Sequence, residues 1–173
     1  MPGALPLSLD LLQSARRDVS LEGRLAVADL SRLKPSLATE RGEAVVELRI
    51  HLGADRRVLV EGTIEAELQL LCQRCMQPMT LSVRARPRLA WVKSEDEAVE
   101  LAEQYEPLLA PEGRVTLADI VTDELLLALP LVPRHEDGAG CGKTAKAARP
   151  KRATPVEDRK KPFAALASLK RGR

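Results

Sequence analysis

Aromatic residues are nearly missing from this sequence, whose 173 residues include one Trp, one Tyr and one Phe. The hydrophobic residues make up 45% of the chain, so the core must be built almost entirely from aliphatic side chains. The shortage also counts against a protein that stacks single-stranded bases on its surface, because such sites need several exposed aromatic faces.

Long apolar runs are missing as well, since none approaches the roughly 20 residues needed to cross a bilayer. The first 18 residues contain neither a basic n-region nor a continuous apolar stretch, so they do not predict a signal peptide. Three cysteines, an odd number, do not suit a secreted disulfide framework. We therefore expect a cytoplasmic protein that has no contact with a membrane.

Charge is distributed unevenly, although the net charge of the chain is only +2. Residues 142–173 contain 11 Lys or Arg and two Asp or Glu, whereas residues 1–141 contain 16 basic and 23 acidic side chains. An acidic body with a basic tail favours a polyanionic partner that is met through the tail. The alternative is a solvated tail that only keeps the protein in solution.

The middle of the chain has the alternating pattern of half-buried β-strands. Residues 44–52 place apolar side chains at every second position, and residues 64–70 and 81–85 repeat the pattern, with 89–92 as a continuation. A strand is also expected at residues 58–61, and Gly62 is expected to interrupt the chain between it and 64–70 as a bulge or bend. Short turns between these strands predict an antiparallel meander. Further strands are expected at 5–9 and 19–27.

Helical spacing occurs on both sides of this meander. The clearest helix is predicted from Thr116, which can cap it, to Leu129, where Pro130 stops it. Shorter helical stretches are expected at 10–17 and 28–33, and the acidic stretch 93–106 is expected to be a loop with one helical turn. The fold class is thus α+β, an antiparallel β-meander sheet covered by a helix, with a flexible basic C-terminal tail.

The composition changes after Pro133 and divides the chain into three parts. Residues 1–135 form the α+β domain, residues 136–161 are a flexible basic linker, and residues 162–173 are a short C-terminal anchor helix. Phe163, Leu166 and Leu169 share one face of that helix and are candidates for docking to a partner. A helix of this length is unstable alone and should form only against a partner or its own domain.

The motif Cys72-Gln73-Arg74-Cys75 lies on a turn between strands and could hold one edge of a tetrahedral metal site. His135 and Cys141 are the candidates for the remaining two ligands. The favoured interpretation is that the two thiols of the motif are free and that the protein has no cofactor. The alternatives are zinc held by all four residues and, less well supported, a redox dithiol.

The stretch Gly138-Ala139-Gly140-Cys141-Gly142-Lys143-Thr144 superficially resembles a phosphate-binding loop. Asp137 stands where that loop requires glycine, and no buried strand leads into it. We therefore predict no nucleotide site. No nucleophile–base arrangement occurs either, and His51 is expected to be a solvated residue on a strand face, so we predict no enzymatic activity and no small-molecule substrate.

Several basic side chains of the tail are suited to contact with RNA phosphates, without reading the base sequence. They are Lys151, Arg152, Arg159, Lys160, Lys161, Lys170, Arg171 and Arg173.

Four stretches together resemble the bacterial YceD family, the large ribosomal RNA subunit accumulation proteins. They are LPLSLDLLQSARR, VEGTIEAELQLLCQRCMQPMTLSV, YEPLL followed by LADIVTDELLLALPLVPRHE, and KPFAALASLKR. The matching positions are Cys72, Gln73, Arg74, Cys75, Asp123, Glu124, Pro130, Pro133, His135, Pro162, Phe163, Leu166, Ser168, Leu169 and Lys170.

The resemblance implies a cytoplasmic, non-enzymatic ribosome-biogenesis factor that supports synthesis, processing or stability of large-subunit (23S) ribosomal RNA. Its partners would be that RNA or its precursor, together with ribosomal proteins. The alternative function is a protein-interaction module that docks a ribosomal protein or assembly factor without direct RNA contact. Some family members have a second cysteine cluster beyond the helix, where this chain has only Cys141.

Overall fold

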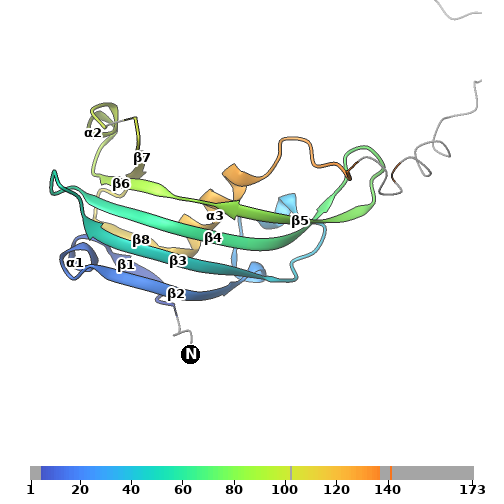
Figure 1. Ribbon diagram of the computed structural model, residues 1–173, viewed down its shortest axis with the longest axis horizontal. Coiled ribbons are helices and arrows are strands. Elements are labelled where there is room, and N and C mark those ends of the chain that lie inside the picture. The colour runs from blue at the N-terminus through green and yellow to red at the C-terminus, as the bar shows by residue number, and fades with distance from the viewer. Residues whose placement is uncertain (1–4, 102, 137–140, 142–173) are drawn as a thin grey trace, which may run out of the picture.

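A curved, mainly antiparallel sheet with a helix against one face forms the body of the protein (Figure 1). The computed structural model describes residues 5–101, 103–136 and 141. Six strands form the main sheet in the order β2-β3-β4-β6-β7, with β5 also paired to β4. Their bounds are Val19–Ala26 (β2), Glu43–Leu52 (β3), Val58–Leu71 (β4), Pro78–Ala85 (β5), Arg88–Val92 (β6) and Glu106–Leu109 (β7).

The predicted alternation is confirmed in the pairing of β3 with β4. Ile50 lies opposite Val60 and Val46 lies opposite Ile64, and all four side chains are buried. The intervening side chains of β3 point to the opposite, solvent-facing side, because successive residues of a strand alternate between faces. The predicted antiparallel meander and the α+β fold class are therefore confirmed.

Gly62 does not interrupt its strand, which corrects the prediction of a bulge or bend. β4 runs from Val58 to Leu71, with Gly62 paired to Leu48. A Cβ atom on Gly62 would lie 2.0 Å from the backbone carbonyl oxygen of Glu47, so a side chain has no room there. The glycine permits a close approach of two strands rather than a break in one.

The long strand β4 has two neighbours along one edge. Its second half pairs with β5, whereas Leu59–Glu61 pairs with β6, and Pro87 lies between these two strands. Strand β7 adds to β6 in parallel, and the sequence did not predict it because Glu106–Leu109 is short, contains Pro107 and does not alternate. The helical turn expected in that stretch is α2, at Glu95–Val99.

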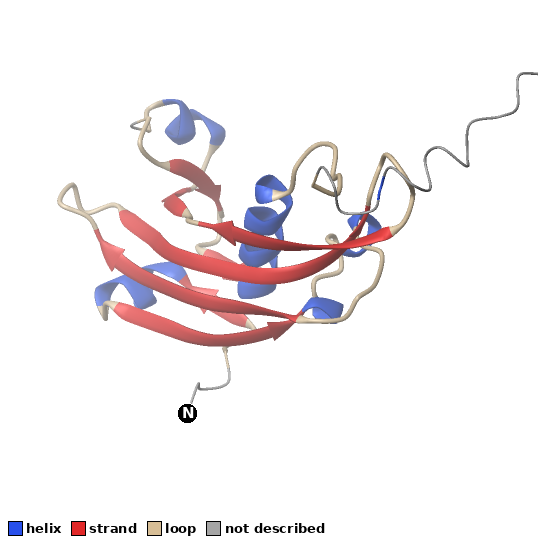
Figure 2. Cartoon of the chain, turned by 45° about the vertical axis from the view of Figure 1, so that its right-hand side comes forward, coloured by secondary structure: helices blue, strands red, loops and turns tan. Residues whose placement is uncertain are grey.

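Helices α1 and α3 both begin after a residue whose side chain caps them. Helix α1 (Leu11–Arg16) is capped by Asp10, whose carboxylate accepts from the Gln13 backbone N–H at 2.8 Å. Helix α3 (Leu117–Ala128) begins after Thr116 as predicted and packs against β4 and β5 (Figure 2). The strand β1 (Ser8–Asp10) pairs with β8 (Arg114–Thr116) in a separate two-stranded sheet.

The stretch 28–33 forms tight turns instead of the expected helix. A 3₁₀ helix covers Val27–Asp29, and a second one, Lys34–Ser36, contains Pro35. Leu30 and Leu33 are nevertheless fully buried, so their apolar spacing reports burial rather than helical conformation.

The core lies between the sheet and the layer formed by α1, α3 and these turns. Its largest fully buried side chains are aliphatic, as the composition requires: Leu11, Leu30, Leu33, Ile50, Ile64, Leu68, Leu70, Leu117 and Leu125. In the described part of the chain, no helix has the length and apolar character needed to span a membrane.

Candidate metal centre

The turn between β4 and β5 presents two cysteines at one end of the sheet. The Cys72 backbone N–H donates to the Gln77 carbonyl at 2.9 Å, and the Met76 N–H donates to the Cys72 carbonyl at 2.8 Å. Met76 occupies the left-handed region at φ 60°, which closes the turn. The chain therefore folds back sharply enough to hold Cys72 and Cys75 side by side.

The segment that follows α3 is distant from this turn in the sequence but lies beside it in the structure (Figure 1). The Gln73 backbone N–H donates to the Pro133 carbonyl at 2.8 Å, which joins the two segments. Two residues later, the His135 backbone N–H points at the Cys72 sulfur, with N and Sγ 3.4 Å apart. Pro130 and Pro133 prevent α3 from continuing, and so the chain is free to run along the turn.

Four potential ligand atoms meet between these segments. The sulfurs of Cys72, Cys75 and Cys141 and a ring nitrogen of His135 all lie within 4.8 Å of one another. The Cys72 and Cys141 sulfurs are 3.7 Å apart, and the Cys75 sulfur is 3.5 Å from His135 Nδ1. These are the four residues that the sequence named as candidates, and they surround a common point rather than standing apart.

Those distances match the edges of a tetrahedral zinc site. With Zn–S near 2.3 Å and Zn–N near 2.05 Å, tetrahedral angles require S···S edges of about 3.75 Å and S···N edges of about 3.55 Å. The Cys72–Cys141 and Cys75–His135 edges are close to these lengths, and all four ligand atoms lie within 4.8 Å of one another.

Positive charge and backbone N–H groups surround the sulfurs. The Arg74 guanidinium donates from Nε to the Cys141 sulfur at 2.9 Å, and this contact is the main reason that the pKa of Cys141 is lowered. Burial opposes ionisation of Cys72, but N–H groups of His135, Arg74 and Cys75 lower the pKa of its thiol to about 5. Cysteine binds a metal as its thiolate, so donors that favour the thiolate also favour the binding of a cation.

Cys75 and His135 form a cysteine–histidine pair, but they lack the character of an activated nucleophile. The Gln77 N–H lowers the pKa of Cys75, yet burial and the neighbouring Cys141 and Cys72 thiols raise it overall. Hydrogen bonds to Cys141 and Cys72 raise the pKa of His135. Four protein ligands around one point fit a closed structural metal site better than a catalytic site, which keeps one position open.

The sequence did not single out Arg74 as part of this site. The position of Arg74 between Cys72 and Cys75 could have indicated its role, because a cation there can offset the charge of two thiolates. The backbone donor of His135 could not be found from sequence, since its place beside Cys72 depends on a contact between distant segments, which the hydrogen bond between Gln73 and Pro133 holds.

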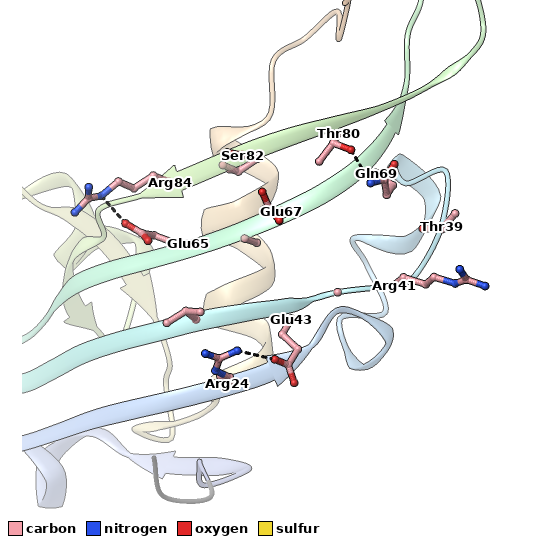
Figure 3. A pocket seen from close by; sticks show the side chains of 14 residues that line it. Arg24, Thr39, Arg41, Glu43, Glu65, Glu67, Gln69, Thr80, Ser82 and Arg84 are labelled. Carbon is pink, nitrogen blue, oxygen red and sulfur yellow. Dashed lines mark hydrogen bonds and ion pairs between the residues drawn. The ribbon is translucent and has the colours of Figure 1, made fainter. Parts of the chain in front are cut away.

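The outer face of the sheet, away from the cysteine cluster, has a pocket that is shown in Figure 3. Its charges are paired within the sheet, with Arg24 on Glu43 at 3.0 Å and Arg84 on Glu65 at 3.1 Å. His51, which was expected to be solvated, instead lies 3.0 Å from Glu61 on this face. These pairs are typical of a polar sheet surface, and they bring no cysteine or serine nucleophile to a histidine.

Several residues named from the sequence lie outside the described part of the chain. They are the RNA-contact candidates Lys151, Arg152, Arg159, Lys160, Lys161, Lys170, Arg171 and Arg173, and the docking candidates Phe163, Leu166 and Leu169. The glycine-rich stretch 138–144 is also outside it, apart from Cys141, which is buried in the cluster.

Comparisons with known proteins agree on one family. Residues 60–170 match the model of the family described as large ribosomal RNA subunit accumulation protein YceD. A Haemophilus influenzae protein named "Large ribosomal RNA subunit accumulation protein YceD" is 35% identical over 169 residues, which cover 96% of each chain. No solved structure gives a significant match.

Proposed function

This chain belongs to the YceD family, and on that premise we propose that it is a non-enzymatic ribosome-biogenesis factor. It supports the synthesis, processing or stability of large-subunit (23S) ribosomal RNA in the cytoplasm, where bacterial ribosomes are assembled. The observation that carries this proposal is the match over 96% of both chains to a protein named for accumulation of that RNA.

The Cys₃His cluster contributes a structural role to this function. We propose that Cys72, Cys75, His135 and Cys141 hold one Zn²⁺ ion, because their donor set and edge lengths suit a closed tetrahedral site. When bound, the metal joins the β4–β5 turn to the chain that follows α3. The Arg74 guanidinium offsets the excess negative charge of three thiolates around a divalent ion.

This joint determines where the basic tail leaves the body. Cys141 is the last of the four cluster residues in the sequence, and the basic stretch 142–173 follows it. In the proposed mechanism the body, which has an excess of acidic residues, faces proteins, and eight basic side chains contact rRNA phosphates: Lys151, Arg152, Arg159, Lys160, Lys161, Lys170, Arg171 and Arg173. Such phosphate contacts give salt-sensitive affinity without sequence specificity.

The second candidate function is a protein-interaction module that docks a ribosomal protein or assembly factor without direct RNA contact. The excess of acidic residues in 1–141 favours it, because ribosomal proteins are generally basic and would be attracted to such a surface.

Crosslinking in cells, followed by sequencing of the bound RNA, separates the two candidates. The full chain is compared with a version that ends at Cys141 and therefore keeps all four cluster residues. Enrichment of large-subunit rRNA that falls on truncation supports direct binding through the tail. If neither version enriches rRNA, direct binding is wrong and the protein-docking function replaces it.

A further inference from the structure

An apolar groove lies beside the candidate metal centre. It runs between the turn after Pro35, the end of β4 with its cysteine turn, and the segment that follows α3. Apolar side chains from these three segments line it: Leu37, Leu71, Met76, Leu126, Leu131 and Pro133. Three segments that are distant in sequence thus present a continuous apolar surface.

The groove is open over much of its length in the described part of the chain. Leu131 is 99% exposed, Met76 is 65% exposed and Leu71 is 42% exposed. Exposed apolar groups that gather around a groove indicate a binding surface, because single exposed residues would instead be scattered. Amphipathic helices commonly bind such grooves, because the groove buries the apolar face of the helix.

A segment with the matching pattern occurs in the same chain. Residues 162–170 read Pro-Phe-Ala-Ala-Leu-Ala-Ser-Leu-Lys, so that Phe163, Leu166 and Leu169 would share one face of a helix. Proline at the first position suits a helix start. Nine residues are too few for a stable isolated helix, and a groove that buries the apolar face would supply the missing free energy.

The tether between groove and segment has a suitable length. Cys141 lies against Cys72 and Arg74, and these two residues are neighbours of the groove-lining Leu71 and Met76. The 20 residues of 142–161 reach about 65 Å when extended and span roughly 25 Å on average when unstructured. The effective concentration of a segment on such a tether is on the order of millimolar, which suffices for a weak contact to form.

We propose that residues 162–170 dock as a helix in this groove of their own chain, with Phe163, Leu166 and Leu169 against Leu71, Met76 and Leu131. The net positive charge of 142–173 and the net negative charge of 1–141 favour the same closed arrangement. This inference concerns contacts within one chain, so it does not depend on which RNA or protein partner the family function involves.

Methionine methyl groups report this contact directly in the full chain. The chain has three methionines, of which Met76 lines the groove and Met79 lies on β5. The test compares ¹³C-methyl spectra of the wild type and the triple variant Phe163→Ser, Leu166→Ser, Leu169→Ser. A second variant, Ala164→Ser with Ser168→Ala, changes the opposite helix face and serves as the matched control. Met76→Leu identifies the Met76 signal.

The proposal predicts that the triple variant moves the Met76 signal, while the control variant matches the wild type. Backbone amides of residues 166–170 should exchange about tenfold more slowly in the wild type than in the triple variant, as expected for a segment bound about nine-tenths of the time. The result should not change over a tenfold range of protein concentration.

Three outcomes would overturn the proposal. An unchanged Met76 signal in the triple variant would mean that the segment does not occupy the groove. A shift that grows with protein concentration would show that the segment of a second copy occupies it. A Met76 signal that moves only after a ribosomal protein or RNA is added would assign the groove to that partner instead.

Discussion

The Nδ1 atom of His135 lies 3.5 Å from the Cys75 sulfur, although 60 residues separate them in the sequence. This contact joins the β4–β5 turn to the chain beyond α3, and a second contact between Cys72 and Cys141 does the same. Both distances equal the edges expected around a zinc ion, so the two pairs together define a candidate metal site.

The two histidines of the chain offer a matched test of this site. We predict that protein purified without chelator contains about one zinc ion per chain, and that His135→Gln lowers zinc affinity at least tenfold. His51→Gln should retain the metal, because His51 lies on the outer sheet face against Glu61. Elemental analysis with a competitive chelator titration measures both. Equal zinc content and affinity in the two variants would contradict a metal site that includes His135.

Arg74 should control the ionisation of Cys141 in the metal-free protein. The guanidinium of Arg74 is the main cause that lowers the pKa of Cys141, so Arg74→Gln raises that pKa and reduces the thiolate fraction at pH 7. Alkylation of Cys141 by iodoacetamide, followed by mass spectrometry across pH, should shift to higher pH. Arg84→Gln, which breaks a pair with Glu65 on the sheet, is the control and should leave the profile unchanged.

Gly62 is predicted to be irreplaceable in β4. A methyl group there would lie 2.0 Å from the Glu47 carbonyl oxygen and 2.9 Å from the Leu48 Cα atom, and both contacts are with backbone. Gly62→Ala should therefore lower the free energy of unfolding by more than about 3 kcal/mol, or prevent folding. Urea denaturation measures the loss against Thr63→Ala at the adjacent position. A loss of less than about 1 kcal/mol would contradict this account of the strand pair.

Glu124 should make stability depend on pH. Burial, with Glu106 and Asp123 nearby, raises its pKa from 4.5 to about 6, so the folded protein binds the proton more tightly than the unfolded chain. This contribution is fully present below pH 4.5 and is lost as the pH rises through 6. Glu124→Gln should therefore stabilise the protein at pH 7 by roughly 1 kcal/mol, given partial solvent screening, and should flatten the profile between these pH values.

Thermal unfolding at several pH values measures this effect. Asp123→Asn, at the adjacent residue, serves as the control. Asp123 is exposed and pairs with Arg32 at 2.6 Å, so removal of its charge should not stabilise the protein. A stability of Glu124→Gln that falls below that of the wild type at pH 7 would show that the carboxylate has a partner when ionised.

The sequence predicted those parts of the fold that local pattern determines. The alternation in β3 and β4 and the capping by Asp10 and Thr116 are properties of adjacent residues, and the structure confirms them. Strand β7 was missed because its parallel pairing with β6 depends on a contact with another strand rather than on its own alternation. Leu30 and Leu33 indicated burial correctly, but tight turns rather than a helix achieve it.

The residues of the candidate site could be predicted from the sequence, but their arrangement in space could not. Cysteine and histidine are few, so Cys72, Cys75, His135 and Cys141 could be named from composition and spacing alone. Whether the two halves meet depends on where Pro130 stops α3 and on the hydrogen bond between Gln73 and Pro133, which no local pattern reveals. The role of Arg74 follows only once Cys141 is in place beside it.

The most direct measurement of the central claim is the ratio of large-subunit to small-subunit rRNA in cells that lack this gene. The account predicts that the ratio falls on deletion, that the wild-type gene restores it, and that His51→Gln restores it equally well. His135→Gln should restore it less well, because this change removes one ligand of the proposed metal site. A ratio that stays unchanged on deletion would contradict the claim that this chain supports accumulation of large-subunit ribosomal RNA.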